Sequence, residues 1–219
     1  MNFSIAEENY IKAIWRLQKD QRNVTTNELS DELQTKPASV TDMLKRLTEK
    51  KLLNYQPYYG VKLTAEGKKL ALSIIRRHRL WEFFLVNKLQ FNWDEVHVIA
   101  EELEHVGSQE LIDRLDQFLG YPKVDPHGDP IPDKTGKVLQ LKQTRLSDWP
   151  LHETAKVSGV DNQSAEMLEL LRHNKISIGS KLELKRKFDF DGSVEIKMGR
   201  QTAFTISKQV AQNLFVTNE

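Results

Sequence analysis

The chain of 219 residues is long enough for two or three compact domains, and its 39% hydrophobic and 29% charged residues are typical of a soluble protein. It contains no cysteine, which excludes disulfides and thiolate metal sites, so a metal site must use nitrogen and oxygen ligands. No apolar run approaches the roughly 20 residues of a membrane span, and residues 1–5 lack the features of a signal peptide. We therefore expect a cytoplasmic protein without a membrane partner.

The net charge of +1 conceals a difference in sign between parts of the chain. Residues 1–79 carry 15 Lys and Arg against 9 Asp and Glu, whereas residues 80–134 carry 4 against 12. A basic N-terminal part suits the phosphate backbone of a nucleic acid, and an acidic middle part suits a divalent cation. Neither charge is decisive by itself, because most charged runs are solvated surfaces.

Residues 5–64 follow the order of a winged helix-turn-helix. Apolar residues at helical spacing, with Thr25 or Thr26 as a cap and a turn that ends at Pro37, predict three helices before a hairpin with a Tyr-Tyr-Gly turn. The expected elements are helices over 5–18, 28–33 and 38–50 and strands over 52–55 and 61–64. In such a module the third helix enters the major groove of DNA, and the hairpin touches the backbone or the minor groove.

The polar side of the third helix supplies the candidate DNA contacts. They are Ser39 and Thr41 for base edges or methyl groups, and Lys36, Lys45 and Arg46 for phosphates. The alternative is a small helical bundle that does not bind DNA. The order of the elements and the positive charge both favour double-stranded DNA as the partner.

Three further helices are expected after the hairpin, over 66–90, 94–106 and 108–119. Ser108 is a plausible cap of the last one. The apolar surface of residues 72–119 exceeds what a three-helix unit of this size needs, and a homodimer interface is the simplest use for it. A proline-rich, irregular segment over 121–132 ends the helical part.

The middle of the chain carries four potential metal ligands in one short run. At helical offsets 0, 4, 7 and 8 these are His97, Glu101, Glu104 and His105. Such offsets fall on one face of a helix, so two imidazoles and two carboxylates can point into the same space. About one helix upstream, His78 and Glu82 stand four residues apart as well. The alternative is a charged face that is only solvated.

The ligand order does not predict an enzyme. No His-Glu-x-x-His sequence places a general base between two histidines, and no Gly-rich phosphate loop is present. A metal site beside a DNA-binding module instead predicts a metal-sensing transcription factor. Two alternatives stay open. One is a metal-independent winged-helix regulator, and the other is a metallohydrolase whose N-terminal module serves only to dock the enzyme.

The hydrophobic pattern changes after a linker over 134–144. Strands are expected over 154–160, 181–190, 193–198 and 202–206, with one helix over 164–172. Residues 190–193, with the sequence Phe-Asp-Gly-Ser, have the composition of a hairpin turn. This pattern predicts a small, β-barrel-like C-terminal domain.

Several segments of the chain match the pattern of a known family. They are Pro37–Thr41, Leu63–Lys68, Arg77–Glu82, Trp93–His97, Glu104–His105, Gly128–Pro132, Ile178–Ser180 and Ala203–Val216. Together they resemble the DtxR/MntR family of metal-dependent transcriptional repressors, in the three-domain form with a C-terminal FeoA-like SH3 domain. The resemblance implies a mainly α fold with a small β domain. Its parts are a winged helix-turn-helix over 1–70, a helical metal-binding and dimerisation domain over 71–134, and an SH3-like β-barrel over 145–219.

Members of this family have two metal sites in each subunit. The resemblance implies a first site of His78, Glu82 and His97, completed by Asp161 or Asn162 of the SH3-like domain. It implies a second site of Asn9, Glu101, Glu104 and His105. Iron-type members have a cysteine where this chain has Glu101, and manganese-type members have a carboxylate. The resemblance therefore favours Mn²⁺, with Fe²⁺ as the alternative and Zn²⁺ as an ion that can bind in vitro.

Two residues of the first expected helix depart from the family pattern. Asn9 stands where an aspartate or methionine ligand is usual, and its neutral amide is a poorer donor. Lys12 stands where two-domain manganese members have a glutamate, so their closely spaced binuclear arrangement is not expected here. In the expected mechanism, a metal at the second site ties the first helix to the dimerisation domain and shifts the population toward conformers that fit DNA.

Overall fold

The computed structural model describes residues 3–18, 22–106 and 108–218. It divides the chain into two compact units. Unit 1 comprises Met1–His78, Glu101–Arg114 and Pro132–Lys137; unit 2 comprises Arg79–Ala100, Leu115–Ile131 and Val138–Glu219. Residues 1 and 2, which entered the expectation that no signal peptide is present, lie outside the described part. None of the described helices is both long enough and apolar enough to cross a membrane.

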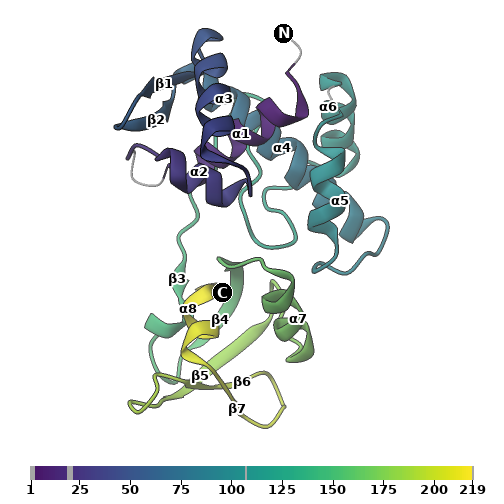
Figure 1. The fold of residues 1–219 in the computed structure, drawn as a ribbon. Coiled ribbons are helices and arrows are strands. Elements are labelled where there is room, and N and C mark those ends of the chain that lie inside the picture. Colours follow the sequence, from purple (N-terminus) through teal and green to yellow (C-terminus); the bar gives the residue numbers. More distant parts are fainter. Residues whose placement is uncertain (1–2, 19–21, 107, 219) are drawn as a thin grey trace. The chain divides into compact units, whose positions relative to one another are not determined.

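The first part of unit 1 has the elements that the sequence predicts (Figure 1). They are α1 (Ile5–Leu17), α2 (Thr26–Glu32), α3 (Pro37–Glu49), β1 (Leu53–Gln56) and β2 (Gly60–Leu63). Capping boxes fix the starts of two helices, because Ser4 exchanges hydrogen bonds with Glu7, and Thr25 with Glu28. Pro37 occupies the first turn of α3, where its missing N–H costs nothing.

The core of this module is formed by the apolar faces of α1, α2 and α3 together with the hairpin. Its fully buried side chains include Ile11, Ile14, Leu29, Leu44 and Leu47. The hairpin β1–β2 is antiparallel with Leu53 opposite Leu63, and Val24 forms a bridge to Val61. The tip of the hairpin exposes Tyr58 and Tyr59, as the tip of a wing does.

Three helices follow the hairpin, as expected. They are α4 (Ala65–Asn87), α5 (Val96–Leu103) and α6 (Gln109–Phe118). Each ends before the predicted boundary, by one to three residues. Ser108 precedes α6, and its hydroxyl accepts a hydrogen bond from the backbone N–H of Leu111 at 3.3 Å.

The C-terminal part of unit 2 is built on one six-stranded antiparallel sheet (Figure 1). Its elements are β3 (Thr144–Arg145), the 3-10 helix η2 (Leu146–Asp148), β4 (Thr154–Val160), α7 (Ala165–His173), β5 (Lys181–Lys187), β6 (Val194–Lys197), β7 (Phe204–Ile206), α8 (Lys208–Asn213) and β8 (Leu214–Thr217). The strand order is β3-β8-β4-β5-β6-β7, and within the described chain no pairing between β3 and β7 closes it. The expected β domain is thus confirmed, but as an open sheet.

The core of this domain is separate from the core of unit 1. It collects buried side chains from the strands and from α7 and α8, including Leu168, Leu171, Leu184, Ile196 and Leu214. Alternation along β5, where Leu182 and Leu184 are buried between exposed or half-buried neighbours, shows that one face of the sheet is covered.

Candidate metal centre

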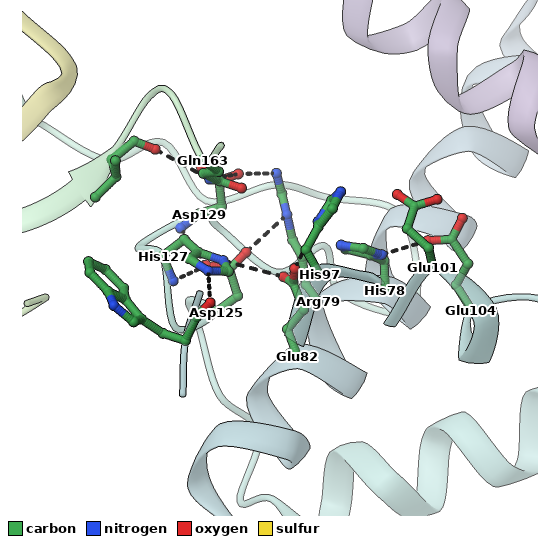
Figure 2. Close-up of polar contacts among 12 residues, drawn as sticks. His78, Arg79, Glu82, His97, Glu101, Glu104, Asp125, His127, Asp129 and Gln163 are labelled. Atoms are coloured by element: carbon green, nitrogen blue, oxygen red, sulfur yellow. Dashed lines mark hydrogen bonds and ion pairs between the residues drawn. The ribbon is translucent and has the colours of Figure 1, made fainter. Parts of the chain in front are cut away.

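Three buried side chains of unit 2 bring possible metal ligands together. Glu82 lies on α4, whereas Asp125 and His127 lie in the loop that follows α6. One ligand atom from each of the three lies within 4.8 Å of the others (Figure 2). All three are buried, and Arg79 Nε lies 3.4 Å from Asp125 Oδ2, so a guanidinium group already offsets part of the negative charge of this cluster.

The ring of His127 is oriented so that Nδ1 can serve as a ligand. Its Nε2 lies 2.8 Å from the backbone oxygen of Trp93, which can only accept a hydrogen bond, so Nε2 carries the proton in the neutral ring. Nδ1 is buried and has no hydrogen-bond partner among the described residues. The nearest oxygen of Glu82 is 3.6 Å away. A backbone carbonyl that fixes the tautomer of a metal-binding histidine is a common arrangement.

The loop that carries Asp125 and His127 is held in a tight turn. Asp125 Oδ1 accepts hydrogen bonds from the backbone N–H groups of His127 and Asp129, at 2.8 and 3.0 Å. Gly128 has a φ of +90°, and a Cβ at this position would lie 2.1 Å from the backbone oxygen of Ser158 in β4. Glycine is therefore required at position 128 both for its backbone conformation and for the close approach.

Burial and mutual charge shift the pKa values of the loop residues. Burial, and then the negative charges of Glu82 and Asp129, raise the pKa of Asp125 to about 7. Burial lowers the pKa of His127, but the carboxylates of Glu82 and Asp125 outweigh it and raise the pKa to about 9. The metal-free cluster thus holds protons at neutral pH that a cation would replace.

The other residues predicted for the first site lie as follows. His78 and Glu82 are one turn apart on α4, as their spacing predicted. His97, near the start of α5, places Nδ1 3.3 Å from Glu82 Oε1. The Asp161 carboxylate pairs instead with Arg145, at 2.9 Å.

The segment around Asp161 reaches the candidate centre through a different residue. The amide nitrogen of Gln163 lies 3.3 Å from Asp129 Oδ2, next to the Asp125–His127 turn (Figure 2). Asn162, the alternative to Asp161, uses its side-chain oxygen to accept a hydrogen bond from the backbone N–H of Ser164. Of these three side chains, Gln163 is therefore the one that contacts the turn.

The residues predicted for the second site lie in unit 1, and a lysine lies among them. Lys12 Nζ is 2.6 Å from Glu101 Oε1, and 2.7 and 2.9 Å from the two oxygens of Glu104. His105 Nδ1 lies 2.6 Å from Glu8 Oε2. Asn9 Oδ1 is buried and has no hydrogen-bond partner among the described residues.

Glu104 is the most deeply buried of these groups. Burial raises its pKa, but the hydrogen bond from His78 and the charge of Lys12 outweigh this effect, so the pKa lies below its ordinary value. His78 Nδ1 is 2.7 Å from Glu104 Oε2 (Figure 2). Glu104 is thus a carboxylate whose lowered pKa keeps it ionised and which already has Lys12 and His78 as partners. In this second set Lys12 therefore contacts both Glu101 and Glu104, whereas Glu82, Asp125 and His127 bring three possible ligand atoms close together.

The candidate DNA contacts lie on or just before α3. Lys36 is its N-cap residue, and the side chains of Ser39, Lys45 and Arg46 are exposed. The hydroxyl of Thr41 donates a hydrogen bond to the backbone oxygen of Pro37 at 3.0 Å, so its methyl group is the part available to a partner.

Sequence reasoning missed Asp125 and His127. It treated residues 121–132 as an irregular connection, although this segment concentrates one histidine and two aspartates among prolines. That local enrichment of ligand types was the available signal, because a loop has no periodicity that would show which side chains share a face.

Three family models match successive parts of the chain. Residues 2–61 match the N-terminal DNA binding domain of the iron dependent repressors, and residues 64–133 match their metal binding and dimerisation domain. Residues 144–218 match the FeoA domain. These matches cover the helical part and the β domain in the order that the resemblance implies.

Individual relatives agree with these models. The HTH-type transcriptional regulator MntR of Oceanobacillus iheyensis is 31% identical over 150 residues, which is 68% of this chain and 95% of that protein. The iron-dependent repressor IdeR of Mycobacterium tuberculosis is 31% identical over 125 residues, or 57% of this chain and 54% of that protein. A probable metal transport system membrane protein of Chlamydia trachomatis is 49% identical over 75 residues, which is only 17% of its length. The chain therefore spans about half of the length of the IdeR relative and less than a fifth of the length of the transport protein.

Solved structures extend the similarity to the whole fold. A manganese-dependent transcriptional repressor in complex with manganese has a TM-score of 0.85 and 32% identity, covering 97% of this chain and 100% of that one. ScaR with bound Zn²⁺ has a TM-score of 0.77 and 31% identity, covering 97% of this chain and 99% of that one. The chain belongs to the iron-dependent repressor family, which is the DtxR/MntR family that its sequence resembles.

Proposed function

We propose that this protein is a homodimeric, metal-dependent transcriptional repressor that binds double-stranded DNA in the cytoplasm and controls genes of metal-ion homeostasis. The observation that carries the proposal is the buried set of Glu82, Asp125 and His127, in which His127 Nδ1 has no hydrogen-bond partner among the described residues, in a chain that also has a winged helix-turn-helix. The family is one of transcriptional repressors, which disfavours the metallohydrolase alternative.

Mn²⁺ is the proposed physiological ion, with Fe²⁺ as the alternative. Two of the three buried ligands are carboxylates and there is no cysteine in the chain, so the donor set favours a hard ion. When bound, the ion would add positive charge beside Glu82 and Asp125, in addition to that of Arg79. His97, beside Glu82, and Gln163, beside Asp129, are the proposed further residues at this centre. His78, which the sequence also predicts as a ligand, pairs with Glu104 in unit 1.

The proposed domain division is 1–70 for DNA binding, 71–134 for metal binding and dimerisation, and 145–219 for the SH3-like domain. It is supported by the similar limits of the three family models. For DNA, the exposed cations of α3 are suited to phosphates, and Ser39 with the methyl group of Thr41 to base edges.

A homodimer would serve the geometry of DNA binding, because two recognition helices must stand about one helical turn of DNA apart. The support for it is the match of residues 64–133 to a dimerisation domain and a group of exposed apolar side chains in the same region. The most exposed of these are Val98, Phe118 and Tyr121.

The test is DNA binding by metal-stripped protein that is titrated with Mn²⁺, Fe²⁺ and Zn²⁺ at buffered free concentrations. Binding to promoter DNA should require metal and should weaken strongly in Glu82→Gln. Lys45→Ala should reduce the salt dependence of DNA binding by about one phosphate contact, whereas Lys187→Ala, an exposed lysine of β5, should leave it unchanged. Equal DNA binding with and without metal would favour the metal-independent regulator.

A further inference from the structure

The Lys12 side chain occupies the place that the family pattern gives to a metal ion. Its ammonium group faces three carboxylate oxygens, one from Glu101 and two from Glu104, all within 2.9 Å. An ammonium group has three N–H donors, so the three contacts use its whole capacity. Lys12 is therefore neither a solvated surface lysine nor a partly satisfied one.

The same contacts oppose entry of a divalent ion. Glu104 is fully buried and the Lys12 side chain nearly so, which means that their attraction is only weakly screened by water. Mn²⁺ bound to the same oxygens would lie within a few ångströms of the ammonium group and would be repelled by it. Removing the ammonium group to solvent, in turn, leaves a buried carboxylate without its partner.

Glu104 and His105 of this set have further partners within unit 1, whereas Asn9 Oδ1 is buried and has no hydrogen-bond partner among the described residues. Glu104 Oε2 pairs with His78 Nδ1 at 2.7 Å, and His105 Nδ1 pairs with Glu8 Oε2 at 2.6 Å. Glu8 is held in turn by Arg77, at 2.6 Å. These pairs join α1 to α4 and to His105, which follows α5, through protein side chains.

We propose that the Lys12 ammonium group is the resident cation of the Glu101–Glu104 pair, and that a divalent ion enters this pair only when Lys12 leaves it. The link between the first helix of the DNA-binding module and α5 is then present in the metal-free protein. The response of DNA binding to metal then depends on the centre formed by Glu82, Asp125 and His127. The effect on DNA binding rests on the proposed function, whereas the test of the inference measures metal binding and uses no DNA.

The test measures Mn²⁺ binding by equilibrium dialysis and by the electron paramagnetic resonance signal of free Mn²⁺. The background is Glu82→Gln, which weakens the other centre. Met is similar to Lys in length but neutral. Replacing Lys12 by Met should raise the Mn²⁺ affinity of the Glu101–Glu104 pair at least about tenfold over that in the Glu82→Gln parent. Lys12→Arg, which keeps the charge, should not. Adding Glu104→Gln to Lys12→Met should abolish the gain.

A matched control lies in the same unit. Lys50 Nζ is 2.6 Å from Glu7 Oε1, and among the described residues this is the one carboxylate with which it forms an ion pair. Lys50→Met should therefore leave Mn²⁺ binding unchanged. If Lys12→Met binds Mn²⁺ no better than its parent, or if Lys50→Met produces the same gain, the proposal is wrong.

A second measurement uses the wild-type protein and covers the case in which the Lys12 variants do not fold. Reductive methylation, read by mass spectrometry, should label Lys12 more slowly than Lys50, and millimolar Mn²⁺ should speed the labelling of Lys12 alone. Rapid labelling of Lys12 without metal would overturn the inference. So would an unchanged labelling rate of Lys12 when Mn²⁺ binds to the Glu101–Glu104 pair. Loss of metal-dependent DNA binding would count against the proposed function and leave these results unaffected.

Discussion

Metal binding at the Glu82, Asp125 and His127 centre should become tighter as the pH rises. The pKa of His127 is about 9, which is about two units above a solution pH of 7. At pH 7 a binding metal ion must therefore displace a proton from His127. That displacement costs about 2.7 kcal/mol, or about a hundredfold in affinity. Each pH unit lowers the cost of this deprotonation by about 1.4 kcal/mol, so Mn²⁺ affinity should rise about tenfold per unit between pH 7 and 8.5.

Below neutral pH the dependence should steepen. The pKa of Asp125 is about 7, so under pH 7 a second proton must leave and the slope should approach a hundredfold per unit. Both raised pKa values also affect the metal-free fold. They contribute stability at low pH, which is lost as the pH rises through about 7 for Asp125 and about 9 for His127.

The assay is anaerobic calorimetric titration of Mn²⁺ between pH 6.5 and 8.5, in pairs of buffers with different ionisation enthalpies, which counts the protons released. About one proton per ion is expected at pH 8, and more below pH 7. His127→Ala should remove most of the dependence above pH 7, while His173→Ala, in α7, should not. An affinity that changes less than about threefold over this range would refute the assignment of the proton to His127.

Three further outcomes are expected. Gly128→Ala should destabilise the protein by about 2 kcal/mol or more in thermal or urea unfolding, because the added Cβ meets the backbone oxygen of Ser158 at a positive φ; an unchanged unfolding midpoint would contradict the close approach. Val98→Asp should shift light scattering at micromolar protein from dimer toward monomer, since it places a charge on an exposed apolar side chain; a dimer of unchanged stability would place the interface elsewhere. Asn9→Asp should raise Mn²⁺ affinity in Lys12→Met more than in the wild type, as measured by dialysis, because the added carboxylate meets an ion only after the ammonium group is gone; equal gains would exclude Asn9 from the ligand set.

The winged helix-turn-helix was predictable because its signals are local. Periodic apolar residues, the Thr25 cap and Pro37 at the start of α3 each depend on neighbours within a few positions, and the structure places these elements within one to two residues of the prediction. The four candidate ligands of the helical run were recognised for the same reason, and their role as ligands stays a prediction. Their roles, however, depend on what other segments bring to them.

The contacts that decide those roles are distant in sequence. Lys12 meets Glu101 and Glu104 across 89 and 92 positions, and no periodicity in either segment reveals that pairing. The C-terminal elements α8 and β8 were missed for a different reason. Six helical residues run directly into four strand residues there, and neither stretch is long enough to show its period.

The loop that carries two of the three ligands is joined to β4 by its main chain. The backbone N–H of Val160 donates to the backbone oxygen of His127 at 3.0 Å, and Gly128 leaves no space between the loop and Ser158. A backbone hydrogen bond does not depend on side-chain identity, so almost any residue at position 160 preserves it, and only proline removes the donor. The β domain can therefore support the metal centre as a scaffold without providing a ligand, and a protein shortened before β4 should bind metal more weakly even with all three ligands intact.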